Sequence, residues 1–129
     1  MTGRSVMLRI PASSAYLVLA RTAAAALCAR LDFPLDRLED VRLAVDEAVS
    51  ALFPHVRPGG EVTCRFDPYD DNSGLTIEVS ATTVDGRGPG PGSFAWTVLT
   101  ALVDDAVATE HEEHVTLTLR VGRDLPVDA

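Results

Sequence analysis

Two segments of this chain alternate apolar and polar side chains with a period of two, and this pattern constrains the fold most. The segments are 62–66 and 115–121, and a further strand pattern lies at 75–80. A strand of this kind has one apolar face, which another layer of structure must cover. The segment 67–74 is dense in Asp, Asn, Ser, Gly and Pro, so we expect it to join the strands on either side as an antiparallel hairpin.

Helical patterns supply the covering layer. One helix is expected over about 12–31, with hydroxyl side chains available to cap its start. A second helix, after Pro34, repeats apolar residues at spacings of three and four, with charged residues on its other faces. Its predicted buried residues are Leu38, Val41, Val45, Ala48, Val49 and Leu52, and its polar residues include Arg37, Asp40 and Glu47. A third helix is expected from Ser93 and is apolar around most of its circumference.

The remaining segments complete the predicted order of elements. A short apolar segment at 6–10 predicts a first strand that Pro11 ends, and the Gly- and Pro-rich segment 85–92 predicts an irregular loop. The order is strand, helix, helix, strand, strand, helix, strand. It predicts an α/β two-layer sandwich, in which a mixed, mostly antiparallel sheet carries its helices on one face. The other face is expected to be exposed or used for association.

The composition is that of one soluble globular domain over residues 1–129. Apolar residues make up 47% of the chain, and no apolar run approaches the ~20 residues of a membrane helix. The net charge of −8 repels polyphosphate backbones, which argues against direct nucleic-acid binding and favours a partner with a basic surface. The N-terminus lacks a signal-peptide hydrophobic region, and Cys28 and Cys64 make a poor disulfide framework. We therefore expect a cytoplasmic protein.

The histidines are weak candidates for chemistry. His55 is expected to cap or pack at the end of the second helix. The segment 110–114 contains two histidines among glutamates, which are residue types that bind metals. We interpret it as a solvated turn before the last strand and expect no metal site.

Two motifs, together with the order of the elements, resemble a known family. Segments 43–49 and 91–105 are similar to those of RsbW-type anti-sigma factors of the GHKL ATPase/kinase fold, and the second is similar to the actinobacterial UsfX branch. The resemblance extends over a core of about 6–121 and implies a histidine-kinase-like ATPase fold. In kinase-competent relatives a glutamate of the second helix is the general base toward a serine of an anti-anti-sigma protein, and Glu47 matches that position.

The nucleotide pocket that the resemblance implies is altered at three places. Family members carry an Mg²⁺-ligating asparagine one helical turn after the glutamate, an adenine-reading Asp-x-Gly after the third strand, and a Gly-x-Gly beside the phosphates. The matching residues here are Ala51 for the metal ligand, Ala81 and Thr83 for the adenine motif, and Ser93 and Ala95 for the glycines. We therefore expect no ATP or Mg²⁺ cofactor and interpret Glu47 as a vestigial base. Phe94 and Trp96 are expected either to fill the vacated volume or to be ordinary core residues.

One charged residue on the first helix indicates a partner surface. Arg21 lies among apolar residues and matches an arginine with which relatives contact both a sigma factor and an anti-anti-sigma protein. We expect Arg21 to bind such partners together with Tyr16 and Val18, because a guanidinium can engage a carboxylate through two parallel hydrogen bonds. The alternative is a solvated arginine without a role.

The resulting hypothesis is an anti-sigma factor that sequesters an alternative, stress- or development-type sigma factor. A STAS-domain anti-anti-sigma protein would antagonise it, without ATP-dependent phosphorylation. One alternative is an active serine/threonine kinase of the same fold that phosphorylates its STAS partner, and another is a scaffold protein that binds neither. A homodimer through the exposed sheet face or an edge is compatible with the pattern, and no nucleic-acid or membrane partner is expected.

Overall fold

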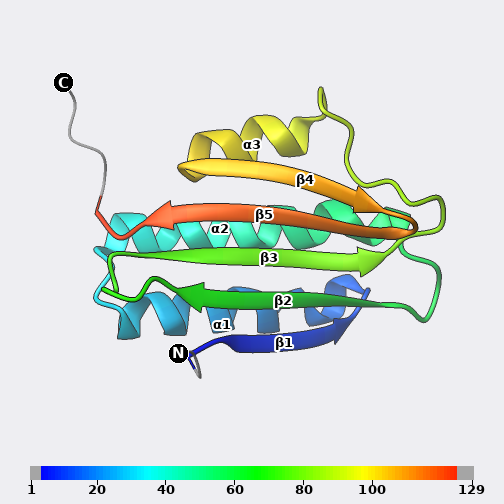
Figure 1. Cartoon of the computed structure of the whole chain (residues 1–129). Coiled ribbons are helices and arrows are strands. Elements are labelled where there is room, and N and C mark those ends of the chain that lie inside the picture. The colour runs from blue at the N-terminus through cyan, green and yellow to red at the C-terminus, as the bar shows by residue number, and fades with distance from the viewer. Residues whose placement is uncertain (1–3, 125–129) are drawn as a thin grey trace.

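The computed structural model describes residues 4–124 and shows one sheet with its helices gathered on one face (Figure 1). Five strands form the sheet in the order β1-β2-β3-β5-β4, and every neighbouring pair is antiparallel. The strands are β1 (Val6–Pro11), β2 (Glu61–Pro68), β3 (Gly74–Thr82), β4 (Asp105–His111) and β5 (His114–Gly122). The predicted two-layer α/β sandwich with helices on one face is confirmed.

Three α-helices within residues 4–124 form the second layer. They are α1 (Leu17–Arg30), α2 (Leu35–Leu52) and α3 (Phe94–Leu102), with short 3-10 helices at Ser14–Tyr16 and Phe53–His55. Ser13 caps the first 3-10 helix, because its hydroxyl accepts a hydrogen bond from Ala15 N at 3.4 Å. None of the helices in this part of the chain combines the length and apolar character that crossing a bilayer requires.

The core lies between the helices and one face of the sheet. Cys64, Val79 and Leu117 are fully buried side by side on β2, β3 and β5, as the alternation predicts. The predicted apolar stripe of α2 packs against this face: Val41, Val45, Ala48, Val49 and Leu52 are fully buried and Leu38 is half-buried. Burying each large aliphatic side chain contributes roughly 1.5–3 kcal/mol, so this stripe is a main source of stability.

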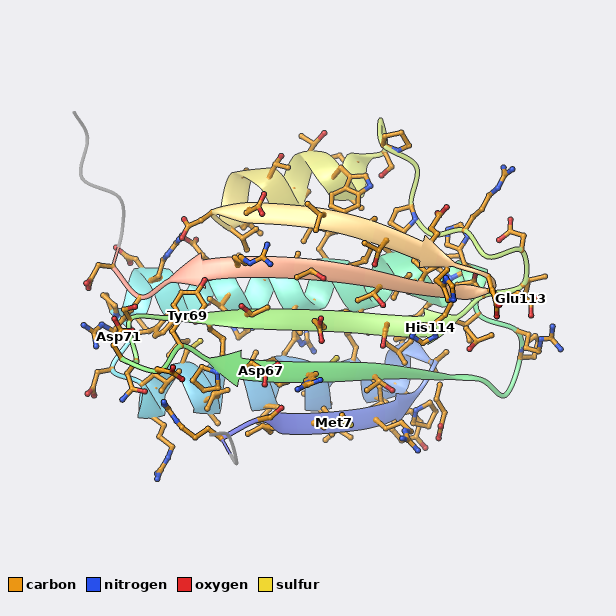
Figure 2. The ribbon with its side chains drawn as sticks, in the orientation of Figure 1. Met7, Asp67, Tyr69, Asp71, Glu113 and His114 are labelled. Atoms are coloured by element: carbon orange, nitrogen blue, oxygen red, sulfur yellow. The ribbon has the colours of Figure 1, made fainter. Side chains whose placement is uncertain are left out.

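The opposite face of the sheet is polar, and it faces the viewer in Figure 2, where Met7 on β1 and Asp67 on β2 are labelled. One row across four strands consists of hydroxyl side chains: Thr63, Ser80, Thr116 and Thr109. A face of this composition can remain in water without a covering layer. Its use for association therefore stays a prediction.

Strand β4 is a correction to the predicted order of elements. We predicted a solvated turn over 110–114, but β4 continues to His111, and the turn contains only Glu112 and Glu113. Glu112 has a φ of 58°, the left-handed conformation that such a tight turn needs. The sequence pattern of β4 is weak because it is an edge strand whose residues are mostly exposed on both faces.

Arg37 is a second correction, since the sequence pattern assigns it to an outer face of α2 and the structure buries it to 4% exposure. Its guanidinium donates to Gly122 O at 2.9 Å, to Leu102 O at 3.2 Å and to Asp104 Oδ1 at 2.5 Å. These acceptors lie at the end of β5 and just around the end of α3. Arg37 therefore fastens the N-terminal part of α2 to α3 and to the sheet.

Candidate functional site

Of the residues matched to a nucleotide pocket, Thr83 and Ser93 are the two ends of the loop that joins β3 to α3, residues 83–93, and Ala81 and Ala95 lie within two residues of those ends. Three of them are almost inaccessible to solvent: Ala81 is 4% exposed, Thr83 is 0% exposed and Ala95 is 8% exposed. Glu47 and Ala51 lie one helical turn apart on α2, and both are half-buried. At these exposures a ligand has little access to the three buried positions.

Two backbone hydrogen bonds fasten the start of the loop. Thr83 N donates to Glu113 O at 2.8 Å, in the turn between β4 and β5, and Val84 N donates to His55 O at 2.8 Å, just after α2. His55, the last residue of the short 3-10 helix, thus holds the loop through its carbonyl, and the capping or packing of its side chain stays a prediction. Because both bonds are main-chain bonds, they form with any side chains at these positions, and no sequence motif predicts them.

The middle of the loop lies directly on the core. A Cβ atom added to Gly88 would lie 2.9 Å from Val115 Cγ1 and 3.5 Å from Leu52 Cδ2, so the loop is in close contact with β5 and the end of α2. The Trp96 indole N–H of α3 donates to Pro89 O at 3.1 Å, which fastens the second half of the loop to the helix. The loop is thus held at its start and in its second half, and it is seated on apolar side chains.

The two aromatic residues at the start of α3 behave differently. Trp96 is half-buried and packs against the core beside the loop, in line with the expectation that it is a packing residue. Phe94 is 75% exposed, so the expectation that it fills a vacated pocket or belongs to the core is wrong. The physical reason is its place on the helix, because the buried face of α3 is set by Ala95 and Leu99.

The residues around the loop do not fit a Mg²⁺-nucleotide. Ala51, Ala81 and Ala95 present methyl groups, which cannot ligate a metal or read a base. The hydroxyls of Thr83 and Ser93 are buried without a hydrogen-bond partner, but they are neutral and cannot balance the charge of a triphosphate. Within residues 4–124, no group of three His, Cys, Asp or Glu side chains could hold a metal ion.

A second region, on α1 and α2, leaves large apolar side chains in water. We call it the α1–α2 patch and define it by Tyr16 (43% exposed), Val18 (49%) and Leu43 (46%), together with Arg21 and Asp46. Tyr16, Val18 and Arg21 are predicted from the sequence, and Leu43 is not. Leu43 could have been found, because it falls between the core positions of α2 and so must face away from the core.

An ion pair lies within the patch. Arg21 Nη1 is 3.5 Å from Asp46 Oδ1, and the two side chains are 37% and 30% exposed. This carboxylate oxygen has no hydrogen-bond partner, so the pair is held by charge attraction alone. Val18 lies one turn before Arg21, and Leu43 one turn before Asp46. The arginine is therefore loosely held, partly exposed and flanked by apolar surface.

The two cysteines lie inside the core and face neither region. Cys28 on α1 and Cys64 on β2 are both 0% exposed. Burial raises the pKa of each thiol to about 12, because a thiolate would lose its hydration there. Since the thiolate is the reactive form, both are expected to be unreactive near neutral pH.

Comparison with known proteins places this geometry in a family. The sequence profile described as the histidine kinase-like ATPase domain matches residues 10–121. The anti-sigma-F factor RsbW of Mycobacterium tuberculosis is 38% identical over 109 residues, which is 84% of this chain and 63% of that protein. The serine-protein kinase RsbW of Listeria innocua is 28% identical over 83 residues, which is 62% of this chain and 53% of that protein. The chain thus spans less than two thirds of the length of these relatives.

A solved structure shows the same fold. The crystal structure of RsbU and RsbW domains from a Mycobacterium tuberculosis protein superposes with a TM-score of 0.72 at 16% identity, over 91% of this chain and 32% of that one. At this identity the likeness concerns the fold. With the profile match over most of the sequence, it shows that the chain belongs to the histidine kinase-like ATPase domain family and has the GHKL fold, with RsbW proteins among its relatives.

Proposed function

We propose that this chain is a cytoplasmic anti-sigma factor that binds an alternative sigma factor, of the stress or development type, through the α1–α2 patch. The observation that carries the proposal is Arg21, partly exposed and flanked by apolar side chains that the fold leaves uncovered. A relative named anti-sigma-F factor supports it and favours the actinobacterial, UsfX-like branch. A STAS-domain anti-anti-sigma protein would release the sigma factor by competing for the same surface.

The chemistry of the patch suits an exchangeable protein partner. Val18 and Leu43 offer apolar anchors, and burying such anchors together with an arginine provides most of the affinity of many interfaces. Arg21 faces Asp46 on one side at ion-pair distance, which leaves donors of its guanidinium free for a partner carboxylate. Two partners that both need this arginine cannot bind together, so competition alone gives a switch.

The fastened loop supports control without phosphorylation. Phosphoryl transfer depends on holding the nucleotide, its metal ion and the acceptor hydroxyl in line. Here the loop is tied to His55, Glu113 and Trp96, and three of the aligned positions, Ala81, Thr83 and Ala95, are almost inaccessible to solvent. Glu47 keeps the position of a general base, but the groups that would bring a γ-phosphate to it are replaced.

The direct test measures sigma-factor binding by the full-length chain and by two charge-reversal variants. Arg21→Glu is expected to weaken binding about 30-fold, which corresponds to about 2 kcal/mol, the size of an interface hot spot. Arg30→Glu is the matched control, since it is exposed on the same helix and outside the patch, and it should change affinity less than threefold. If no sigma factor of the native host is inhibited in transcription at stoichiometric concentration, the proposal is wrong.

The kinase alternative rests on two observations, namely Glu47 and the similarity to proteins named serine-protein kinases. Trp96 is the single tryptophan and contacts the loop, so its fluorescence reports nucleotide entry. We expect no saturable change with Mg-ATP and no labelled phosphate on a STAS partner. Saturable Mg-ATP binding together with phosphoserine on the partner, with only the phosphoserine lost in Glu47→Gln, would establish the kinase instead.

A further inference from the structure

The two edges of the sheet are protected to different degrees. β1 ends in Pro11 and carries Arg9, which pairs with Glu61 at 3.9 Å, and both features discourage pairing with another strand. β4, at the other edge, contains neither proline nor a lysine or arginine. Among the described residues, no main-chain hydrogen bond from outside the sheet reaches 105–111. The outward N–H and C=O groups of β4 are therefore available.

A groove runs between this edge and α3. Its volume is about 690 Å³, and it is lined by Pro89, Pro91, Trp96, Thr100, Ala106, Val107, Ala108 and Glu110. In Figure 1, α3 (yellow) extends beyond β4 (orange), so the helix overhangs the edge of the sheet. The edge strand forms one wall, and the helix with its aromatic side chain forms the other. We call it the α3–β4 groove.

We propose that the α3–β4 groove binds an extended peptide segment of a partner protein, which pairs with β4 as a sixth strand and places a lysine or arginine beside Glu110. An added strand supplies main-chain partners for the unused groups of β4. This surface lies at the opposite edge of the sheet from β1, against which α1 packs, so the proposal is independent of the α1–α2 patch.

The groove suits a single strand of alternating character. A neighbouring strand lies about 4.8 Å away, and every second side chain of it would enter the groove. Ala106 and Ala108 are small and leave room there, while Trp96 offers an aromatic surface for an aliphatic or proline side chain. Glu110 is the one charged side chain among the lining residues, on a chain of net charge −8. Charge complementarity therefore favours a basic residue in the peptide.

A second copy of this chain fits the same edge less well. Two β4 strands paired about a two-fold axis would put both α3 helices on the same side of the joined sheet. Each helix overhangs its edge, so both helices would crowd the joint between the two copies. The copy would also bring its own Glu110 into a groove that contains a carboxylate and no cation. A narrow peptide avoids both conflicts.

In the test, random heptapeptides from a display library are selected for binding to the immobilised full-length chain. Peptides that also bind the Thr100→Arg variant are then discarded. Thr100 lines the groove and is exposed, so an arginine there fills it and repels a basic peptide. We expect enrichment of alternating β-branched or apolar peptides with one lysine or arginine. Titrating a synthetic copy should change Trp96 fluorescence and slow hydrogen exchange at the outward amides of β4.

The matched control is Thr97→Arg, which is exposed on α3 one turn earlier and does not line the groove. Thr100→Arg should weaken the peptide at least tenfold and Thr97→Arg less than twofold, and Glu110→Gln should weaken it severalfold and reduce its salt dependence. The proposal is overturned if no selected peptide depends on Thr100, or if exchange in β4 does not slow. A concentration-dependent dimer that Thr100→Arg abolishes would assign the groove to a second copy instead.

Discussion

The loop at 83–93 and the α1–α2 patch differ in how far their groups are held by contacts within the chain. The loop is tied by main-chain hydrogen bonds to His55 and Glu113, and Gly88 within it lies against the core. In the patch, Val18 and Leu43 stay nearly half exposed, and Arg21 has a single loose partner. The loop is held by contacts within the chain, whereas the patch leaves apolar side chains uncovered.

This difference separates stability from recognition. Completed contacts must be broken before anything else can bind, so substitutions in the loop region are expected to change the free energy of unfolding. Removing uncovered apolar side chains costs the free protein little stability. Their burial contributes free energy only when a partner covers them. The comparison predicts that variants of the two regions will fall into two classes.

The largest effect on stability is expected at Arg37, which holds α3 at the end away from the loop. Replacing it in Arg37→Met removes three donors and leaves Leu102 O and Asp104 without them, which should cost about 3 kcal/mol. Urea denaturation measures the change. Arg42→Met, on the same helix but half exposed and paired with Glu39 at 2.6 Å, should hardly shift the midpoint. Equal stability of the two variants would show that the buried Arg37 does not stabilise the packing of α2 against α3 and the sheet.

The fold was predictable because its periodic patterns are strong in central elements. Val62, Cys64 and Phe66 alternate on β2, and the α2 stripe repeats without interruption, so both fix a buried face. β4 was missed because an edge strand exposed on both faces needs no alternation. Arg37 was misplaced because its burial depends on carbonyls of residues 65 or more positions away, which no local pattern records.

The candidate site was predictable only where a side chain carries the chemistry. The resemblance could identify Ala51 and Arg21, because each replaces or matches a named side chain. It could not predict that the loop is held by His55 O and Glu113 O, since main-chain bonds leave no sequence signal. Whether Arg21 binds partners stays a prediction, because the structure shows its exposure and not its use.

The next effect concerns Gly88, where the loop touches the core. In Gly88→Ala the new methyl would lie 2.9 Å from Val115 Cγ1, so either the loop or the core must shift, at a cost of about 2 kcal/mol. Gly90→Ala is the control, because nothing lies within 4 Å of its added Cβ, and it should be neutral or slightly stabilising. Thermal denaturation of both variants measures the difference. A Gly88→Ala protein as stable as the control would mean that the loop is not seated on the core.

The buried cysteine thiols make stability depend on pH. One of them, Cys28, is on α1, the helix that also carries the exposed Val18 of the patch. The pKa of each thiol is about 12 when folded against an ordinary value of 9.0, so the unfolded chain releases protons first as pH rises. The stability that the buried thiols contribute is therefore fully present below pH 9 and is lost above it, by roughly 1 kcal/mol per thiol between pH 8 and pH 10. Urea midpoints at both values should converge in Cys28→Ala/Cys64→Ala. A wild-type midpoint unchanged at pH 10 would contradict burial of the thiols.

The smallest effect on stability is expected in the patch itself. Removing the Arg21 side chain in Arg21→Ala breaks a partly exposed ion pair without a hydrogen bond, so the free energy of unfolding should change by less than about 1 kcal/mol. Asp46→Ala should behave in the same way, and the double variant should show little coupling. Chemical denaturation gives the three values. A loss of about 2 kcal/mol or more in Arg21→Ala would show that this arginine stabilises the fold, as the contacts of the loop do. Weakened partner binding would then reflect unfolding instead of lost recognition.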